Sequence, residues 1–209
     1  MSILRKLFRA TPIPTTDGAF SPSPLAIKLG TSTTTDYDGG AYAKPFVGLK
    51  NRVLMICTEE RKMTMANGKK FSTGNHPVEM GLPMLHLMNA GFEIDIVTPN
   101  GAPVAIEEWA MPADDADVKR LYRDHADAFA NPGSLADFVE HKMNDAVSYA
   151  AVYIPGGHGA MLGLPDNEDV GKVLHWAHEQ DLFTLALCHG PAALLAAKTE
   201  KGFLYEGYK

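Results

Sequence analysis

The chain of 209 residues contains only two cysteines, Cys57 and Cys188, and no extended apolar stretch. Two cysteines cannot build a disulfide framework, so the composition favours a reducing compartment such as the cytoplasm. No segment approaches the roughly 20 consecutive apolar residues that a membrane-spanning helix needs. The 19 basic residues are outnumbered by 25 acidic ones, giving a formal net charge of -6. This balance argues against a broad electrostatic surface for nucleic acid or anionic membranes, so we expect small-molecule or protein partners.

The amino-terminal region differs in composition from the rest of the chain. No acidic residue precedes Asp17, and three basic residues do, which faintly suggests a transit peptide; the apolar segment of a secretory signal is missing. Residues 10 to 50 are rich in Pro, Gly, Ser and Thr, which predicts an irregular arm that needs other parts of the protein for order. We therefore assign residues 1–50 to an arm and residues 51–209 to one domain.

Strand and helix patterns alternate through that domain. Apolar runs predict strands over 52–58, 92–99, 149–157 and 182–188, and amphipathic or capped segments predict helices over 76–91, 114–129, 134–143, 166–180 and 190–198. Strands separated by helices pair in parallel through right-handed crossovers. The sequence therefore predicts an α/β fold, with a mostly parallel sheet and helices on both faces.

Cys188 stands where such a sheet places its ligands, at the carboxyl end of a strand. In "ALCHG" small neighbours permit a tight strand-to-helix turn that projects the nucleophile, although many free cysteines are buried and inert. The start of the following helix directs amide groups toward the sulfur, so we expect a lowered thiol pKa. Cys57 has no such turn behind it and is predicted to be a core residue.

The glycines of "PGGHG" also follow a strand, but Leu162 stands where a dinucleotide-binding loop requires glycine. We interpret the amides of Gly157 and His189 as donors to an oxyanion; a merely tight turn is the alternative. His158 could line the site, but we predict it to be a solvated loop residue.

Glu79, at the third helical position after Pro77, has two interpretations that the residues alone do not separate. It could cap its own helix, or it could point at the thiol and exchange a proton. His175 and His178 share a helix face without further ligands nearby, so they are expected to pack at the surface.

Four segments together resemble the HchA-type branch of the ThiJ/PfpI superfamily: "FSTGNHPVE", "EEWAMP", "IPGGHGAMLGLPD" and "LALCHGPAALLA". The resemblance begins near residue 36 and implies a flavodoxin-like fold related to class I glutamine amidotransferases. It implies a homodimeric, heat-inducible stress-response chaperone with glyoxalase III (lyase) and protein deglycase (hydrolase) activities that need no cofactor. The resemblance places the nucleophile at Cys188, its histidine at His189 and an active-site glutamate at Glu79. The expected substrates are methylglyoxal, glyoxal and glycated proteins.

Two departures from the family pattern bear on function. Glu93 and His125 match two positions of a His-Glu-His metal set, but Met88 replaces the first histidine, so we expect no structural metal. The acid that orients the histidine lies about 25 to 30 residues past the nucleophile in this branch, whereas only Glu200 and Glu206 follow Cys188. We therefore expect the domain to be incomplete at its carboxyl end and its turnover to be depressed.

Two other functions stay open at this point. A holdase chaperone would bind unfolded clients on exposed apolar surface and would not need Cys188. Amidotransfer or proteolysis would share the nucleophile elbow but gain nothing from Glu79.

Overall fold

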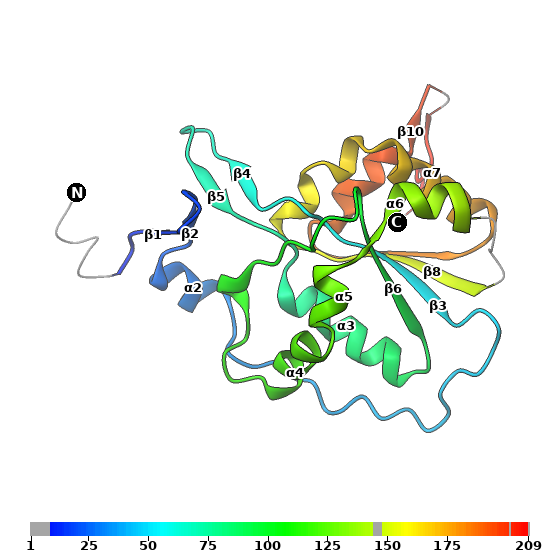
Figure 1. Ribbon diagram of the computed structural model, residues 1–209, viewed down its shortest axis with the longest axis horizontal. Coiled ribbons are helices and arrows are strands. Elements are labelled where there is room, and N and C mark those ends of the chain that lie inside the picture. Colours follow the sequence, from blue (N-terminus) through cyan, green and yellow to red (C-terminus); the bar gives the residue numbers. More distant parts are fainter. Residues whose placement is uncertain (1–8, 144–147, 201, 209) are drawn as a thin grey trace.

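The computed structural model describes residues 9–143, 148–200 and 202–208 (Figure 1). Five parallel strands form the central sheet, in the order β7-β6-β3-β8-β9. Their bounds are β3 (Arg52–Ile56), β6 (Glu93–Thr98), β7 (Gly133–Ser134), β8 (Tyr149–Ile154) and β9 (Phe183–Ala186). The predicted α/β architecture with a mostly parallel sheet is confirmed.

Helices cover both faces of this sheet, and alternate side chains of β3 divide the core between them. Val53 and Met55 pack in a cluster with residues of three helices, α3 (Pro77–Asn89), α4 (Ala116–Asp124) and α5 (Ala126–Ala130). Leu54 and Ile56 face the opposite cluster, with α6 (Leu135–Asp137) and α7 (Glu168–Glu179). Figure 1 shows the two helical layers on opposite sides of the strands. Each fully buried aliphatic side chain of this kind contributes roughly 1.5–3 kcal/mol.

Several predicted helices are present in altered form. The segment 114–129 is broken at His125, whose φ of -107° and ψ of 15° leave the helical range between α4 and α5. The segment 134–143 consists of α6 and a π-helical turn η2 (Phe138–Lys142). The helix expected after Cys188 is a 3-10 helix, η6 (Gly190–Ala197). Other 3-10 turns among the described residues are η1 (Glu108–Ala110), η4 (His158–Met161) and η5 (Leu164–Asp166).

A second, four-stranded sheet joins the arm to the domain. Its order is β1-β2-β5-β4, with the bounds β1 (Ile13–Pro14), β2 (Phe20–Ser21), β4 (Lys62–Thr64) and β5 (Lys70–Ser72). The arm is less irregular than its composition predicts, because it also contains a helix, α2 (Pro24–Gly30), whose amino end is capped by the Ser23 side chain. The β4–β5 hairpin was missed, although Asn67-Gly68 is a strong sequence signal for such a turn.

Strand β9 forms one edge of the central sheet, where Phe183 is 73% exposed and Leu185 and Leu187 are each 40% exposed. A short antiparallel pair, β10 (Lys198–Thr199) and β11 (Gly202–Phe203), follows η6. Cys57 is fully buried just after β3, which confirms its assignment to the core. Of the helices in the described ranges, none has the length and apolarity needed to cross a bilayer.

Candidate active site

Cys188 occupies a sharp turn at the carboxyl end of β9. Its φ of +53° lies in the left-handed region that non-glycine residues seldom adopt, as in a nucleophile elbow. The chain then passes close beneath β8, because a Cβ on Gly190 would lie 2.5 Å from the carbonyl oxygen of Ile154. Cys188 is an exposed residue whose sulfur is partly covered, whereas Cys57 is fully buried. The local backbone thus presents the sulfur of Cys188 to an incoming molecule.

The loop after β8 brings a second backbone segment to the sulfur. Gly157 has a φ of +106°, and a Cβ there would lie 2.3 Å from the carbonyl oxygen of Gly74. The backbone amides of Gly157 and His189 approach the sulfur and favour its ionised form. The two predicted oxyanion donors therefore converge on the reactive atom, although their action on a substrate oxygen stays a prediction.

Glu79 approaches Cys188 from the first turn of α3. Its side chain does not cap the helix, because the His76 backbone N–H that such a cap would bind donates instead to the Gly156 carbonyl oxygen at 2.9 Å. A Cβ on Gly156 would lie 1.9 Å from Glu79 Oε2 and 2.7 Å from Cys188 Cβ, so the carboxyl group and the cysteine flank the same glycine. No N–H or O–H among the described residues reaches the buried Oε2. Of the two interpretations of Glu79, the geometry favours the one in which it faces the thiol.

The buried Tyr153 and the partly buried Tyr122 hold the first turn of α3 in place. Tyr153, on β8, donates its hydroxyl hydrogen to the Glu79 carbonyl oxygen, and Tyr122, on α4, donates to the Pro77 carbonyl oxygen at 2.9 Å. Burial raises the pKa of both hydroxyls, so they remain protonated donors. The elements on this face of the sheet thereby fix the position of Glu79.

The expectation of a lowered Cys188 pKa is wrong. Burial raises the pKa of the thiol above its ordinary value, and the charge and hydrogen bonding of the Glu79 carboxylate raise it further. The amides of His189 and Gly157 act in the opposite direction but do not outweigh these effects. The resting site therefore holds Cys188 as a thiol beside the Glu79 carboxyl group.

His189 lies beside the cysteine, with its Nδ1 3.2 Å from Cys188 Sγ. Within residues 9–143, 148–200 and 202–208 no carboxylate hydrogen-bonds to its ring. Glu200 and Glu206, the acids downstream of Cys188, are both exposed. The orienting acid of a Cys-His-acid triad is thus absent from the described chain.

His158 was predicted to be a solvated loop residue, and this prediction is wrong. Its side chain is 35% exposed, and its Nδ1 lies 2.8 Å from Oε1 of the fully buried Glu107. Its ring centroid lies 4.7 Å from that of His189. Sequence reasoning missed Glu107, because nothing in "EEWAMP" distinguishes its buried glutamate from the exposed Glu108. Of the surface pair on α7, His178 is exposed while His175 is half-buried.

The residues of the weak metal set do not form a binding site. Glu93 pairs with Arg52 at 3.0 Å, and His125 Nδ1 lies 3.1 Å from the Leu121 carbonyl oxygen. Met88 offers no strong ligand at the third position. The described residues contain no cluster of three or more His, Cys, Asp or Glu side chains arranged to hold a metal ion.

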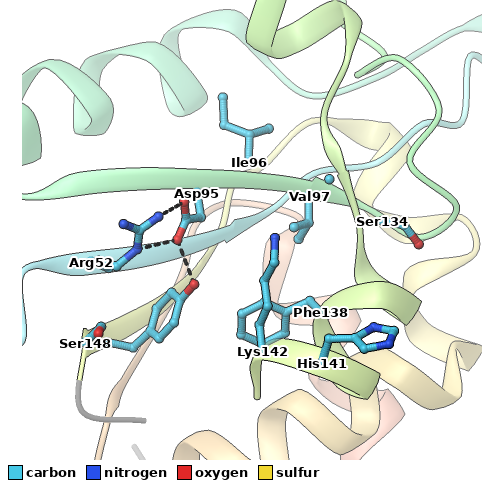
Figure 2. Close-up of a pocket in the computed structure, with 11 residues that line it drawn as sticks. Arg52, Asp95, Ile96, Val97, Ser134, Phe138, His141, Lys142 and Ser148 are labelled. Atoms are coloured by element: carbon cyan, nitrogen blue, oxygen red, sulfur yellow. Dashed lines mark hydrogen bonds and ion pairs between the residues drawn. The ribbon is translucent and has the colours of Figure 1, made fainter. Parts of the chain in front are cut away.

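Another cavity, of about 490 Å³, opens beside β6 and η2 (Figure 2). Its charged groups satisfy one another: Asp95 accepts hydrogen bonds from Arg52 and from the Tyr149 hydroxyl. Lys142 and His141 line its other side. None of the residues that line this cavity belongs to the Cys188 site.

The fold and the site together define an α/β protein with a cysteine at a strand-to-helix elbow and a glutamate against its thiol. The model of the DJ-1/PfpI family matches residues 71–208, and the chain belongs to this family. The chain is 46% identical over 200 residues to Protein/nucleic acid deglycase HchA from Staphylococcus aureus (strain bovine RF122 / ET3-1), covering 95% of this chain and 68% of that protein. The protein of the same name from Pseudomonas aeruginosa (strain UCBPP-PA14) is also 46% identical, over 202 residues, with 95% and 69% covered.

Two solved structures share the fold. Rapid Encystment Protein 24 kDa from Francisella tularensis gives a TM-score of 0.61 at 25% identity, over 73% of this chain and 64% of that one. Glyoxalase III from Candida albicans gives a TM-score of 0.58 at 23% identity, over 73% and 62%. The chain thus spans less than two thirds of each of these solved chains. The name of the bacterial relatives includes nucleic acid, which conflicts with the expectation that this protein has no nucleic-acid partner. The net charge argues only against a broad binding surface, and it does not exclude a base held in a small pocket.

Proposed function

We propose that Cys188 carries out glutathione-independent chemistry on small reactive aldehydes, converting methylglyoxal to lactate and glyoxal to glycolate. The observation that carries this proposal is the pairing of Cys188 with Glu79 across Gly156, where a thiol and a carboxyl group are placed to share one proton. The relatives named deglycase HchA and the likeness to the chain named glyoxalase III support it. Removal of early aldehyde adducts from proteins or nucleic acids is the related activity that those names suggest.

The arrangement accounts for each proton in the reaction. Glu79 accepts the thiol proton as Cys188 sulfur bonds to the aldehyde carbon, and the aldehyde oxygen takes up a proton to complete a hemithioacetal. A base, Glu79 or His189, then removes the hydrogen from that carbon, and the neighbouring carbonyl oxygen takes up a proton to give an enediol. Return of a proton to the neighbouring carbon, with loss of the hydroxyl proton from the carbon bonded to sulfur, leaves a thioester. Water cleaves the thioester, releasing the hydroxy acid and restoring the thiol. The overall change is the addition of one water to methylglyoxal.

A raised thiol pKa is compatible with this sequence of steps. A thiolate formed only as the substrate arrives is protected from unrelated electrophiles, while Glu79 keeps a proton acceptor in contact with the sulfur. The amides of Gly157 and His189 are available to stabilise the oxygen on which negative charge develops. The described chain supplies no acid to orient His189, which supports slow turnover.

Exposed apolar surface supports a second candidate, binding of unfolded clients by a holdase chaperone. Among the described residues β9 pairs only with β8. Phe183 and Leu185 on β9 and Leu187 just after it expose side chains on one face of this edge strand, and Leu195 on η6 is 56% exposed. Such a surface offers unpaired strand edge and apolar contact to an unfolding chain. Cytoplasmic location and homodimer formation stay predictions alongside it.

The substitution Cys188→Ser separates the two functions. Aldehyde chemistry predicts that methylglyoxal consumption and lactate formation fall to background in this variant, while suppression of client aggregation is unchanged. Cys57→Ala is the matched control, because it removes the other thiol from a position buried in the core. Lactate formation that persists in Cys188→Ser, or that is lost in a folded Cys57→Ala, would contradict the proposal.

A further inference from the structure

Glu107 is a fully buried carboxylate that the proposed reaction does not use. Its Oε1 accepts three hydrogen bonds: from Thr73 Oγ1 at 3.1 Å, from the His158 backbone N–H at 3.1 Å and from the His158 ring at 2.8 Å. Its Oε2 has no partner among the described residues. Three donors on one oxygen are the pattern of an ionised carboxylate, and a buried charge persists only beside an opposite one. The counter-charge that the structure offers is the imidazolium of His158.

His158 connects this buried carboxylate to the reactive cysteine. It follows Gly157, whose amide lies near the Cys188 sulfur, and its ring lies 4.7 Å from the ring of His189. Nδ1 of His158 is hydrogen-bonded to Glu107, so Nε2 is the ring nitrogen that can bind another group. No acceptor for Nε2 lies within hydrogen-bond reach among the described residues. Its partly exposed ring can therefore meet a molecule bound at the cysteine.

Neighbouring groups hold His158 in this state and orientation. The hydrogen bond to Glu107 raises the pKa of His158, burial acts against this, and the charges of Glu107 and Glu79 raise it further. The rings of Phe71 and Trp109 lie 5.4 Å and 6.2 Å from the imidazole and restrict its rotation.

We propose that the Glu107–His158 pair supplies a positive charge to the Cys188 site and that His158 Nε2–H binds the anionic oxygen of a ligand there. The chemical class that fits is a small α-hydroxycarboxylate, or the enediolate that precedes it, because both place a negatively charged oxygen within a few ångströms of the sulfur. Assignment of these ligands rests on the proposed function; the positive charge beside the thiol does not.

Alkylation of Cys188 tests the charge without any turnover of aldehyde. Iodoacetate and iodoacetamide react with the thiolate in the same way, forming an S–C bond and releasing iodide, but only iodoacetate carries a negative charge. The ratio of their rate constants therefore reports the local charge at the sulfur. Reaction of the Cys188→Ser variant gives the background from Cys57.

The decisive variant is Glu107→Gln. Its amide oxygen still accepts from Thr73 and from a neutral His158 ring, but the imidazole no longer has a carboxylate to keep it charged. We expect the iodoacetate rate at pH 6.5 to fall about tenfold, equivalent to about 1.4 kcal/mol, while the iodoacetamide rate stays within about twofold. If only the loss of one negative charge mattered, Glu107→Gln would react faster with the anionic iodoacetate. The predicted decrease in the iodoacetate rate therefore has the opposite sign to a simple effect of net charge.

Two further variants complete the experiment. His158→Gln should lower the iodoacetate rate at least as much as Glu107→Gln, whereas Glu108→Gln, which removes an exposed acid one residue away, should leave the ratio unchanged. In the wild type the ratio should decline as pH rises through the raised pKa of His158, with Glu79, Glu107, Cys188 and His189 as the other titrating groups that face it. A thermal unfolding profile shows that each variant is folded. An unchanged ratio in both folded Glu107→Gln and folded His158→Gln would overturn the proposal, whether or not the protein consumes methylglyoxal.

Discussion

Replacing Gly156 with alanine inserts a methyl group between Glu79 and Cys188. The new Cβ would lie 1.9 Å from Glu79 Oε2 and 2.7 Å from Cys188 Cβ. To restore ordinary van der Waals contact, the carboxyl group must withdraw by about 1.5 Å or more. The backbone of Gly156 does not have a positive φ, so alanine is compatible with its conformation.

We expect Gly156→Ala to reduce catalytic turnover more than it reduces the stability of the fold. Displacing a catalytic group by about 1 Å can lower turnover about 100-fold, equivalent to about 2.7 kcal/mol in the barrier. The flexible end of Glu79 can move aside, so we expect a stability loss of only about 1–3 kcal/mol, as for an overpacked site. Because the carboxylate moves away from the thiol, iodoacetamide alkylation of Cys188 at pH 7 should become faster while methylglyoxal turnover falls.

The assay compares lactate formation and alkylation rates in wild type, Gly156→Ala and the control Gly30→Ala. Gly30 ends α2 without a positive φ, and a Cβ added there would have no atom within 4 Å, so its substitution should change neither rate. Turnover within about threefold of wild type in a folded Gly156→Ala protein would refute the assignment of Glu79 to the reaction.

Two other substitutions test the supports of the site. Tyr153→Phe removes the hydrogen bond to the Glu79 carbonyl oxygen and should cost about 1–2 kcal/mol in urea unfolding with a several-fold loss of kcat, whereas an unaltered kcat would show that this bond does not position Glu79. Asp115 caps α4 and binds the Thr35 amide and hydroxyl, and these hydrogen bonds lower its pKa although burial acts against them. A lowered pKa stabilises the fold above about pH 4 and loses that effect as pH falls through the folded-state value. Wild type should therefore lose more stability than Asp115→Asn on acidification below about pH 4, and equal slopes for the two proteins would contradict this.

The parts of the fold that could be predicted are those with a strong local pattern. The apolar run at Val53 to Ile56 predicts a strand buried on both faces, and the structure divides its side chains between two core clusters. Ends of elements were less predictable, because nothing near His125 in the sequence indicates a helix break. The β2–β5 pairing joins segments about 50 residues apart, a contact that no local pattern encodes.

The features of the active site that could be predicted are likewise those with a strong local pattern. The elbow at Cys188 and the glycines around Gly157 follow from residue types that a tight turn requires, so sequence alone could locate them. The direction of the thiol pKa shift could not be predicted, since it depends on how far the folded chain covers the sulfur and then on how closely Glu79 approaches across Gly156. Glu107 was missed for a related reason: its burial and its partner His158 arise only when three loops meet in the folded chain.

The most direct test of the central claim, that Cys188 and Glu79 share one proton, is the pH profile of iodoacetamide alkylation of Cys188. In wild type the rate should rise only at a pH above the ordinary range of a cysteine, because burial and Glu79 raise the pKa of the thiol. Glu79→Gln removes the negative charge but keeps the shape of the side chain, so its profile should shift to lower pH and its rate at pH 7 should increase. A profile that is unchanged, or that shifts to higher pH, in Glu79→Gln would contradict the account.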